Sequence, residues 1–185
     1  MRVESTAFKD VFILHNDVHG DQRGYFLESF NQRDFQQQTG LDTTFVQDNQ
    51  SKSQYGVLRG LHWQAGEHAQ AKLVRVLRGS VLDVIVDLRR DSATFGKHLS
   101  LLLTDENQQQ LYVPRGFAHG FVVLSAEAEF FYKCDAFYHR EAEQGIIYND
   151  PALAINWQIP DTDIILSPKD QQLPYLATIP DKYLF

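Results

Sequence analysis

Cysteine and methionine are scarce in this chain, since each occurs once among 185 residues. A single thiol, Cys134, excludes an intramolecular disulfide and a cysteine-based zinc site. No run approaches the roughly 18 consecutive apolar residues of a membrane-spanning helix, and residues 1–10 lack the apolar stretch of a signal peptide. These absences predict a soluble, cytoplasmic protein that does not enter a membrane.

Positive charge is also scarce: 17 Lys and Arg stand against 24 Asp and Glu and leave a formal net charge of −7. An acidic chain without Lys/Arg runs is a poor match to nucleic-acid binding, which depends on neutralising phosphates. The sequence therefore predicts no nucleic-acid partner. One small anionic ligand is still compatible with this charge if a few cations converge locally.

Repeats, low-complexity tracts and linker-like stretches are absent, which predicts one domain over residues 1–185. Short apolar runs between polar or glycine-containing turns indicate an antiparallel β-barrel or sandwich. The clearest runs are 24–30, 44–50, 71–77, 81–88, 98–103, 110–113, 120–124 and 129–135. Two of these runs flank Arg78-Gly79-Ser80 and predict a hairpin there, with a positive φ at Gly79.

Helix signals are few. Residues 31–39 predict one helix, which Gly40 ends. The tail after Asn149 holds five of the six prolines, and proline is poorly tolerated in central strands. We expect this tail to pack over the barrel as irregular turns and short helices. The predicted fold class is therefore all-β with short helical decorations.

Three segments place polar residues among the strands: 45–51, 57–64 with Lys72 beyond it, and 112–121. Their apolar neighbours imply that the polar side chains face an interior lumen, where a buried charge needs a partner or a ligand. The third segment contains Pro-x-Gly-x-x-His, which resembles the second half-motif of the cupins. This resemblance implies a cupin-like jelly-roll barrel.

Metal-binding cupins carry His-x-His in the first half-motif, where this chain has His62-Trp63-Gln64. A glutamine amide oxygen is a weak ligand for metals that prefer imidazole. Only His62 and His119 are left, and no carboxylate follows at the right spacing. The sequence therefore predicts no metal site and no cofactor.

Longer motifs carry a more specific resemblance, which begins near Gly20 and covers most of the chain. They include residues 59–64, residues 113–121, Tyr148-Asn149-Asp150-Pro151 and Leu166-Ser167-Pro168-Lys169-Asp170. In order and spacing these motifs resemble the dTDP-4-dehydrorhamnose 3,5-epimerase family. The resemblance implies a metal-free epimerase that inverts C3 and C5 of a dTDP-4-keto-6-deoxyhexose, on the route to dTDP-L-rhamnose and cell-surface polysaccharide.

The resemblance also implies four catalytic residues. His62 matches the family's base, Asp170 the carboxylate that orients it, and Lys72 the cation beside the C4 oxygen. Tyr132 matches the proton donor on the other face of the sugar, and a phenol with an ordinary pKa of about 10 is protonated at neutral pH. These four residue types suit the chemistry, because removing a proton from the carbon next to a ketone needs a base and an oxyanion stabiliser.

The nucleotide half of the substrate has counterparts as well. Arg23 and Arg59 resemble the cations that hold the diphosphate, a role suited to a forked guanidinium, and Tyr138 resembles the aromatic residue that stacks on thymine. The other positions that match substrate contacts are Glu28, Gln47, Asp48, Asn49, Lys72, His119, Glu143 and Lys169. The resemblance further implies a homodimer with N-terminal strand exchange, in which Arg23 and Glu28 act across the interface.

Other interpretations stay open. Read alone, Asp170 suits a turn, Tyr132 a strand core and Lys72 a strand edge. The alternative functions are an epimerase of one centre only, a non-catalytic cupin that binds a sugar nucleotide, and a metal-dependent cupin oxygenase.

Strand alternation gives two further expectations. Arg75, Asp83 and Asp87 alternate on strand faces, and we interpret them as an internal ion-pair network. Cys134 follows Tyr132 by two residues, so the two side chains share one face of a strand. We expect Cys134 to be a packing thiol there.

Overall fold

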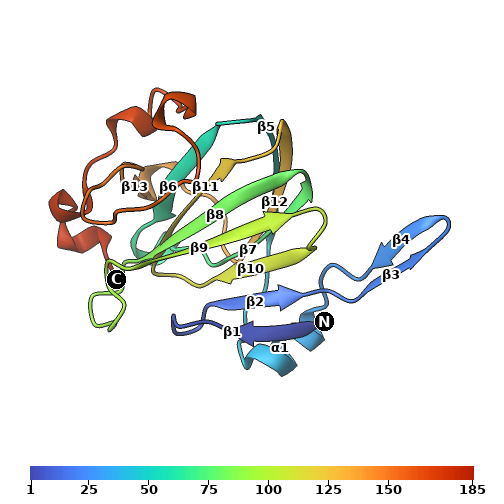
Figure 1. Ribbon diagram of the computed structural model, residues 1–185. Helices are drawn as coiled ribbons and strands as arrows, with labels where there is room; N and C mark the ends of the chain where they lie inside the picture. The colour runs from blue at the N-terminus through green and yellow to red at the C-terminus, as the bar shows by residue number, and fades with distance from the viewer.

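Two antiparallel β-sheets lie face to face in the computed structural model, which describes residues 1–185 (Figure 1). One sheet has six strands: β1 (Arg2–Ser5), β2 (Phe12–His15), β10 (Gln109–Val113), β7 (Lys72–Arg78), β12 (Glu127–Cys134) and β5 (Gln47–Gln54), in that spatial order. The other has five: β13 (Glu143–Gly145), β6 (Leu58–Gln64), β11 (Phe117–Val123), β8 (Ser80–Asp87) and β9 (His98–Thr104). The all-β prediction is confirmed.

Apolar side chains pack in three layers. The first layer lies between the two sheets, and Val74, Ile85 and Phe130 are among its residues. The second covers the outer face of the five-stranded sheet, where Trp63 packs beneath apolar residues of the tail. The third lies on the outer face of the six-stranded sheet around Phe35. Because both faces of the five-stranded sheet are covered, its central strand β11 is buried throughout and the neighbouring β8 almost throughout.

The single α-helix, α1 (Gln32–Thr39), begins and ends as the sequence predicts. The Asn31 side chain caps its N-terminus by accepting hydrogen bonds from the backbone N–H groups of Arg33 and Asp34. Gly40 ends it in the left-handed conformation with φ at 71°. The helix packs Phe35, which is fully buried, into the third apolar layer. None of the helices has the length and hydropathy needed to cross a membrane.

The turn at Gly79 differs from the prediction. It joins β7 to β8, but β7 pairs with β10 and β12, whereas β8 pairs with β9 and β11. The predicted hairpin is therefore wrong, because this turn crosses from one sheet to the other. The positive φ is confirmed at 78°, and a Cβ at Gly79 would lie 2.2 Å from the carbonyl oxygen of Glu127.

The predicted network of Arg75, Asp83 and Asp87 is also wrong. Asp87 pairs with Arg89, two residues along the chain, at 2.8 Å. Arg75 donates instead to the side-chain oxygen of Gln108 at 3.2 Å. Its neighbours Val74 and Val76 occupy the layer between the sheets, so alternation turns Arg75 to the outer face, away from both aspartates.

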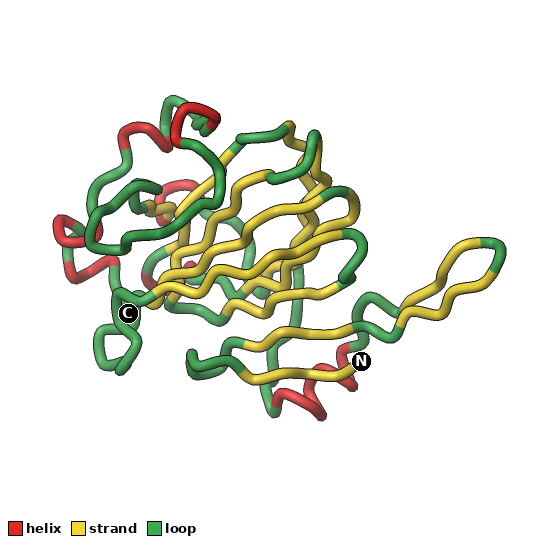
Figure 2. The backbone as a smooth tube through the Cα atoms, viewed as in Figure 1, coloured by secondary structure: helices red, strands yellow, loops and turns green.

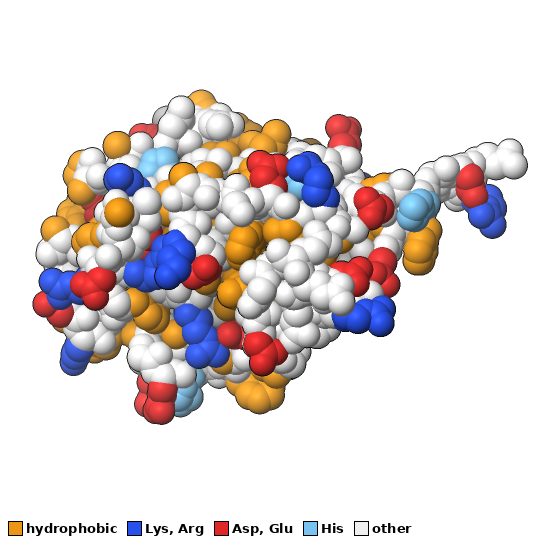
Figure 3. Space-filling view, turned by 90° about the horizontal axis from the view of Figure 1, so that it is seen from below, with side chains coloured by type: hydrophobic (Ala, Val, Ile, Leu, Met, Phe, Trp, Pro, Cys, Tyr) orange, Lys and Arg blue, Asp and Glu red, His pale blue; other side chains and the backbone are white.

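A hairpin of β3 (Val18–Asp21) and β4 (Gly24–Leu27) projects from the body as an arm (Figures 1 and 3). Nearly all of its residues are exposed, including Tyr25 at 61% and Phe26 at 70%. The arm contacts little of its own chain, although its aromatic side chains are of the kind that proteins usually bury.

The tail after β13 consists of loops and short 3₁₀ helices, as predicted (Figure 2). The helices in the tail are η3 (Asp161–Asp163), η4 (Asp170–Gln172), η5 (Leu176–Thr178) and η6 (Asp181–Tyr183); η1 (Gly66–His68) and η2 (Arg140–Ala142) precede it. The tail lies against the five-stranded sheet (Figure 1). This packing carries Asp170 back to the strand that holds His62.

Candidate active site

Two adjoining cavities lie at the lumen. The larger has a volume of about 630 Å³ and the smaller about 250 Å³. Four residues line both cavities and so mark the place where they meet: Asn49, His62, Lys72 and Tyr132. Three of these four are predicted catalytic residues.

His62 and Asp170 form a close pair, although 108 positions separate them. The Nε2 atom of His62 lies 2.6 Å from Oδ1 of Asp170. The His62 side chain is 26% exposed and faces the cavity, whereas that of Asp170 is 5% exposed. Burial alone would raise the pKa of Asp170, but the hydrogen bond and charge of His62, helped by hydrogen bonds from Ser167 and the Gly60 backbone, hold this pKa below its ordinary value.

A β-bulge explains how β6 turns two functional side chains toward one cavity. Arg59 and His62 are three residues apart, so a regular strand would point them to opposite faces. On β11 their partners are Phe121 and His119, only two residues apart, so β6 holds one extra residue here. Gly60 occupies this bulge with φ at 121°, and a Cβ there would lie 2.5 Å from the Cα of Gly120.

Lys72 and Tyr132 come from the opposite sheet. The Lys72 Nζ atom lies 5.9 Å from the centroid of the Tyr132 ring. No carboxylate lies within 4.0 Å of Lys72, and burial lowers its pKa. Burial also raises the pKa of Tyr132, which keeps the phenol protonated at neutral pH. The cavity therefore has an imidazole on one wall and a proton-bearing phenol with a cation on the other.

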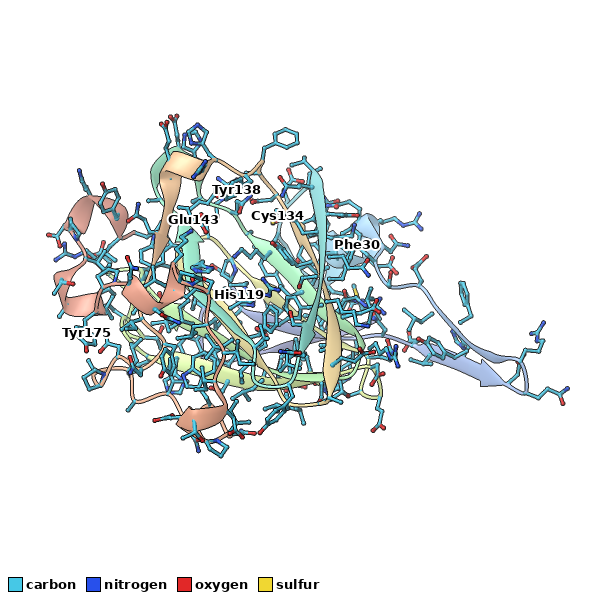
Figure 4. The ribbon with its side chains drawn as sticks, turned by 90° about the horizontal axis from the view of Figure 1, so that it is seen from above. Phe30, His119, Cys134, Tyr138, Glu143 and Tyr175 are labelled. Carbon is cyan, nitrogen blue, oxygen red and sulfur yellow. The ribbon has the colours of Figure 1, made fainter.

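The other predicted binding residues of the cavities make mutual contacts. Glu143 accepts a hydrogen bond from the Tyr138 hydroxyl at 2.8 Å and pairs with Lys169 at 2.6 Å. Figure 4 shows Tyr138 and Glu143 together at one end of the barrel. Gln47 lines the smaller cavity and accepts from the Tyr138 backbone N–H at 3.0 Å. Arg59 lines the larger cavity, with Nε and Nη2 each 3.1 Å from the Ser53 hydroxyl.

His119 lies deeper between the sheets (Figure 4). It is 7% exposed, and its Nε2 atom lies 2.9 and 3.1 Å from the two carboxylate oxygens of Asp83. The residue still lines the larger cavity. The structure thus brings His119 to the cavity with one ring nitrogen already engaged.

Three predicted binding residues do not reach either cavity. Asp48 points to the other face of β5, where it pairs with Lys133 at 2.9 Å, because its neighbours Gln47 and Asn49 face inward. Arg23 and Glu28 belong to the arm and the loop after it. Arg23 pairs with Asp21, and Glu28 accepts from Asn31 at 3.0 Å.

Some residues that line the cavities were not predicted as site residues from the sequence. Phe121, Phe130 and Ser167 line the larger cavity. Phe130 precedes Tyr132 by two residues, so strand alternation places both side chains on one face and could have predicted Phe130 at the cavity. Cys134 lines the smaller cavity on the face of Tyr132, as alternation predicts, and burial raises the pKa of its thiol to about 11. The thiol is therefore protonated at neutral pH.

The histidines of the cavity each face a single carboxylate, Asp170 for His62 and Asp83 for His119. No group of three or more His, Cys, Asp or Glu side chains is placed to hold a metal ion. The donor set therefore does not have the three-ligand geometry that open metal sites use.

The family model described as dTDP-4-dehydrorhamnose 3,5-epimerase matches residues 5–178 of the chain. The chain belongs to this family. A relative of the same description from Escherichia coli (strain K12) is 53% identical over 94% of this chain and 93% of its own. Membership makes the chain an isomerase and confirms the predicted family.

Solved structures of the family share the fold. A dTDP-6-deoxy-D-glucose-3,5-epimerase from Legionella pneumophila, in complex with dTDP-4-keto-L-rhamnose, superposes with a TM-score of 0.95 at 46% identity; the match covers 99% of this chain and 96% of that one. A 3'-monoepimerase from Streptomyces bikiniensis, in complex with dTDP-quinovose, has a TM-score of 0.86 at 33% identity, covering 94% and 87%. The cupin-like jelly-roll prediction is confirmed.

Proposed function

We propose that the chain epimerises C3 and C5 of dTDP-4-dehydro-6-deoxy-D-glucose to give dTDP-4-dehydro-L-rhamnose. One observation carries the proposal: the His62–Asp170 pair on one wall faces Tyr132 and Lys72 on the other, across a shared cavity. Inversion at carbon needs a base on one face of the sugar ring and an acid on the other. Binding alone needs neither, which argues against a non-catalytic cupin.

His62 acts as the base in this proposal. Its Nε2 atom is engaged with Asp170, so Nδ1 is the atom that takes the proton from the carbon next to the ketone. The electrons of the broken C–H bond form the enolate, and the negative oxygen lies beside the Lys72 ammonium. Because Lys72 has no carboxylate partner in the cavity, its charge is free to stabilise that oxygen.

Tyr132 completes the inversion by donating its hydroxyl proton to the opposite face of the same carbon, and the ketone forms again. The tyrosinate then regains a proton and imidazolium His62 loses one, so the site is restored with no net change except configuration. The same sequence at the second carbon gives the double inversion. The raised pKa of Tyr132 favours reprotonation of the tyrosinate between the two steps.

The remaining residues of the cavities are assigned to binding the nucleotide half of the substrate. We assign the diphosphate to Arg59 and Lys169, which supply cations at the larger cavity, and thymine to Tyr138, which is 52% exposed beside the smaller one. A substrate in contact with both Arg59 and Tyr138 spans the place where the cavities meet. The hexose follows the diphosphate along the substrate, so the diphosphate has to lie close enough to this junction for C3 and C5 to reach His62, Lys72 and Tyr132.

The arm fits a homodimer with N-terminal strand exchange. Tyr25 and Phe26 expose aromatic surface on it, and Arg23 stands at its tip. In this arrangement the partner's arm supplies the Arg23 and Glu28 contacts that the cavities lack within one chain. Sedimentation at micromolar concentration tests the dimer, and a monomeric mass would contradict it.

Proton NMR of dTDP-4-dehydro-6-deoxy-D-glucose with the protein in D₂O tests the reaction, with and without EDTA. We expect deuterium at both C3 and C5, unaffected by EDTA. Exchange at one carbon alone would identify a single-centre epimerase, the activity named for the Streptomyces neighbour. No exchange would overturn the proposed function, and loss on adding EDTA would overturn its metal-free chemistry.

A further inference from the structure

Asp150 is a buried carboxylate for which the proposed reaction has no direct use. It is 3% exposed, and no cation lies within 4.0 Å of it. Its two oxygens accept backbone N–H groups instead: Oδ1 from Ala152 at 2.9 Å and Oδ2 from Leu176 at 2.7 Å. A buried charge is unfavourable unless its hydrogen bonds are made, so both of these bonds matter.

The bond to Leu176 closes a long loop of the tail. Between Asp150 and Leu176 the chain carries Lys169 and Asp170, two residues of the proposed site. The bond is made at the start of η5, shortly after the η4 helix that Asp170 opens. Asp150 therefore holds the far end of the segment that presents Asp170.

Two further contacts support the same end of that segment. The Ile147 N–H donates to the Pro174 carbonyl at 3.0 Å. The Leu173 side chain packs so closely on Gly145 that a Cβ there would lie 2.7 Å from it. Gly145 is in register with His62 across β13 and β6. These contacts connect the end of the segment directly to the strand that carries the base.

The other end of the segment is fixed at Ile165, which exchanges hydrogen bonds with Gly56 and Leu58 at 2.8 and 2.9 Å. Between the two ends, the backbone hydrogen bonds of residues 166–173 are local, from Gln171 to Ser167 and from Gln172 to Lys169. No backbone–backbone hydrogen bond ties this stretch to the barrel, and its direct ties are side-chain ones, Asp170 to His62 and Lys169 to Glu143, each at 2.6 Å. The two ends of the segment therefore limit how far the Asp170 carboxylate can move from His62.

We propose that Asp150 is a positioning residue, which holds the Asp170 carboxylate on His62 through the N–H group of Leu176. The catalytic consequence rests on the proposed function, but the positioning itself does not. A carboxylate suits this place because it accepts two N–H groups at once. An asparagine would have to turn its NH₂ group toward one of them.

The sharpest variant is Leu176→Pro, which removes the donating N–H group. Leu176 is the first residue of η5, and Tyr175 before it is extended with φ at −74° and ψ at 150°. Proline suits the first position of a helix and an extended residue before it. Leu176→Ala is the matched control, since it loses the same side chain and keeps the N–H group. Asp150→Asn removes one of the two acceptor oxygens from the other side, so its amide opposes an N–H group at Leu176 or Ala152.

The first readout is the proton NMR signal of the His62 N–H group in its short bond to Asp170, which Asp170→Asn assigns by abolishing it. We expect this signal in wild type and Leu176→Ala, and its loss or displacement in Leu176→Pro and Asp150→Asn. The rate of deuterium exchange at C3 and C5 should fall about 100-fold in the latter two, the scale of a misplacement of about 1 Å. A purely structural role would lower thermal stability and leave the signal in place.

Two results would overturn the proposal. One is a folded Leu176→Pro or Asp150→Asn protein that keeps both the His62 signal and wild-type exchange rates. The other needs no variant. It is a wild-type protein in which the Leu176 backbone amide exchanges its hydrogen with solvent as fast as the tail amides that donate no hydrogen bond. If wild type shows the His62 signal but no exchange into the sugar, the proposed function fails, and the positioning is judged on the signal alone.

Discussion

Two histidine–aspartate pairs lie side by side in the lumen, and they differ in where the carboxylate comes from. His62 and His119 are register partners on β6 and β11. Asp83 stands on the strand next to His119, so the sheet itself makes the second pair. Asp170 comes from the tail, 108 residues from His62. The first pair thus depends on how the tail docks, whereas the second forms with the barrel.

The two pairs also differ in exposure. The side chains of His119 and Asp83 are 8% and 0% exposed, while His62 is 26% exposed above a buried Asp170. A histidine needs access to a ligand in order to take its proton. A buried carboxylate needs a fixed partner in order to be tolerated. Under the proposed function, the open pair, His62–Asp170, performs the chemistry, whereas the closed pair, His119–Asp83, supports the fold and the charge of the lumen.

The largest effect is expected from His62→Ala. Loss of the base should abolish exchange at both C3 and C5, at least by the 10²–10⁴-fold typical of a general base, and should leave affinity for dTDP nearly unchanged because Arg59 and Tyr138 remain. Deuterium incorporation and calorimetric titration with dTDP measure the two effects. Substantial turnover by this variant would remove His62 from the mechanism.

Tyr132→Phe tests the wall opposite the open pair. The variant keeps His62, so proton abstraction should continue while the inversion falls, by about 100-fold for loss of a general acid. Deuterium should then enter the substrate faster than product appears. If exchange and inversion both stay at the wild-type rate, Tyr132 is a structural residue.

The sequence predicted the strands well, because β alternation and turn residues are local signals. It predicted the turn at Gly79 but not its partners, since strand pairing depends on contacts distant in sequence. The Asp83 carboxylate was assigned to ion pairs with arginine for the same reason. Nothing local in Ser-Pro-Lys-Asp points to His62, and only the family resemblance supplied that pair. The alternation of residues along β6 does not predict the bulge at Gly60, which brings Arg59 and His62 to one cavity.

Asp83→Asn tests the closed pair. The substitution keeps the shape of the side chain but removes its charge and one hydrogen-bond acceptor in a fully buried place. We expect the free energy of unfolding to fall by about 2 kcal/mol, the scale for leaving a buried hydrogen-bonding group without its partner. Asp170→Asn should cost less, because the His62 it leaves unpaired faces the cavity. Urea unfolding of both variants makes the comparison, and the reverse order would contradict it.

The smallest expected effect is a dependence of activity on pH, which Lys72 causes and which links the two histidine–aspartate pairs. Burial lowers the pKa of Lys72, while Cys134, Asp83 and Glu143 act to raise it. Because the enolate needs the charged ammonium, activity should fall as the pH rises through that pKa, below the ordinary 10.5 of lysine. Burial raises the pKa of Tyr132 above the ordinary 10.0, so loss of the phenol proton limits activity only above that pH.

The position of this alkaline limb separates the roles of the groups around Lys72. Lys72→Arg keeps a cation that does not titrate in this range, so the activity that remains should show no alkaline fall below pH 10.0, the ordinary pKa that Tyr132 exceeds. Asp83→Asn removes a charge that favours the ammonium and should move the limb to lower pH. A limb that stays in place in both variants would show that the closed pair and Lys72 act independently, and the electrostatic link between the two pairs would be lost.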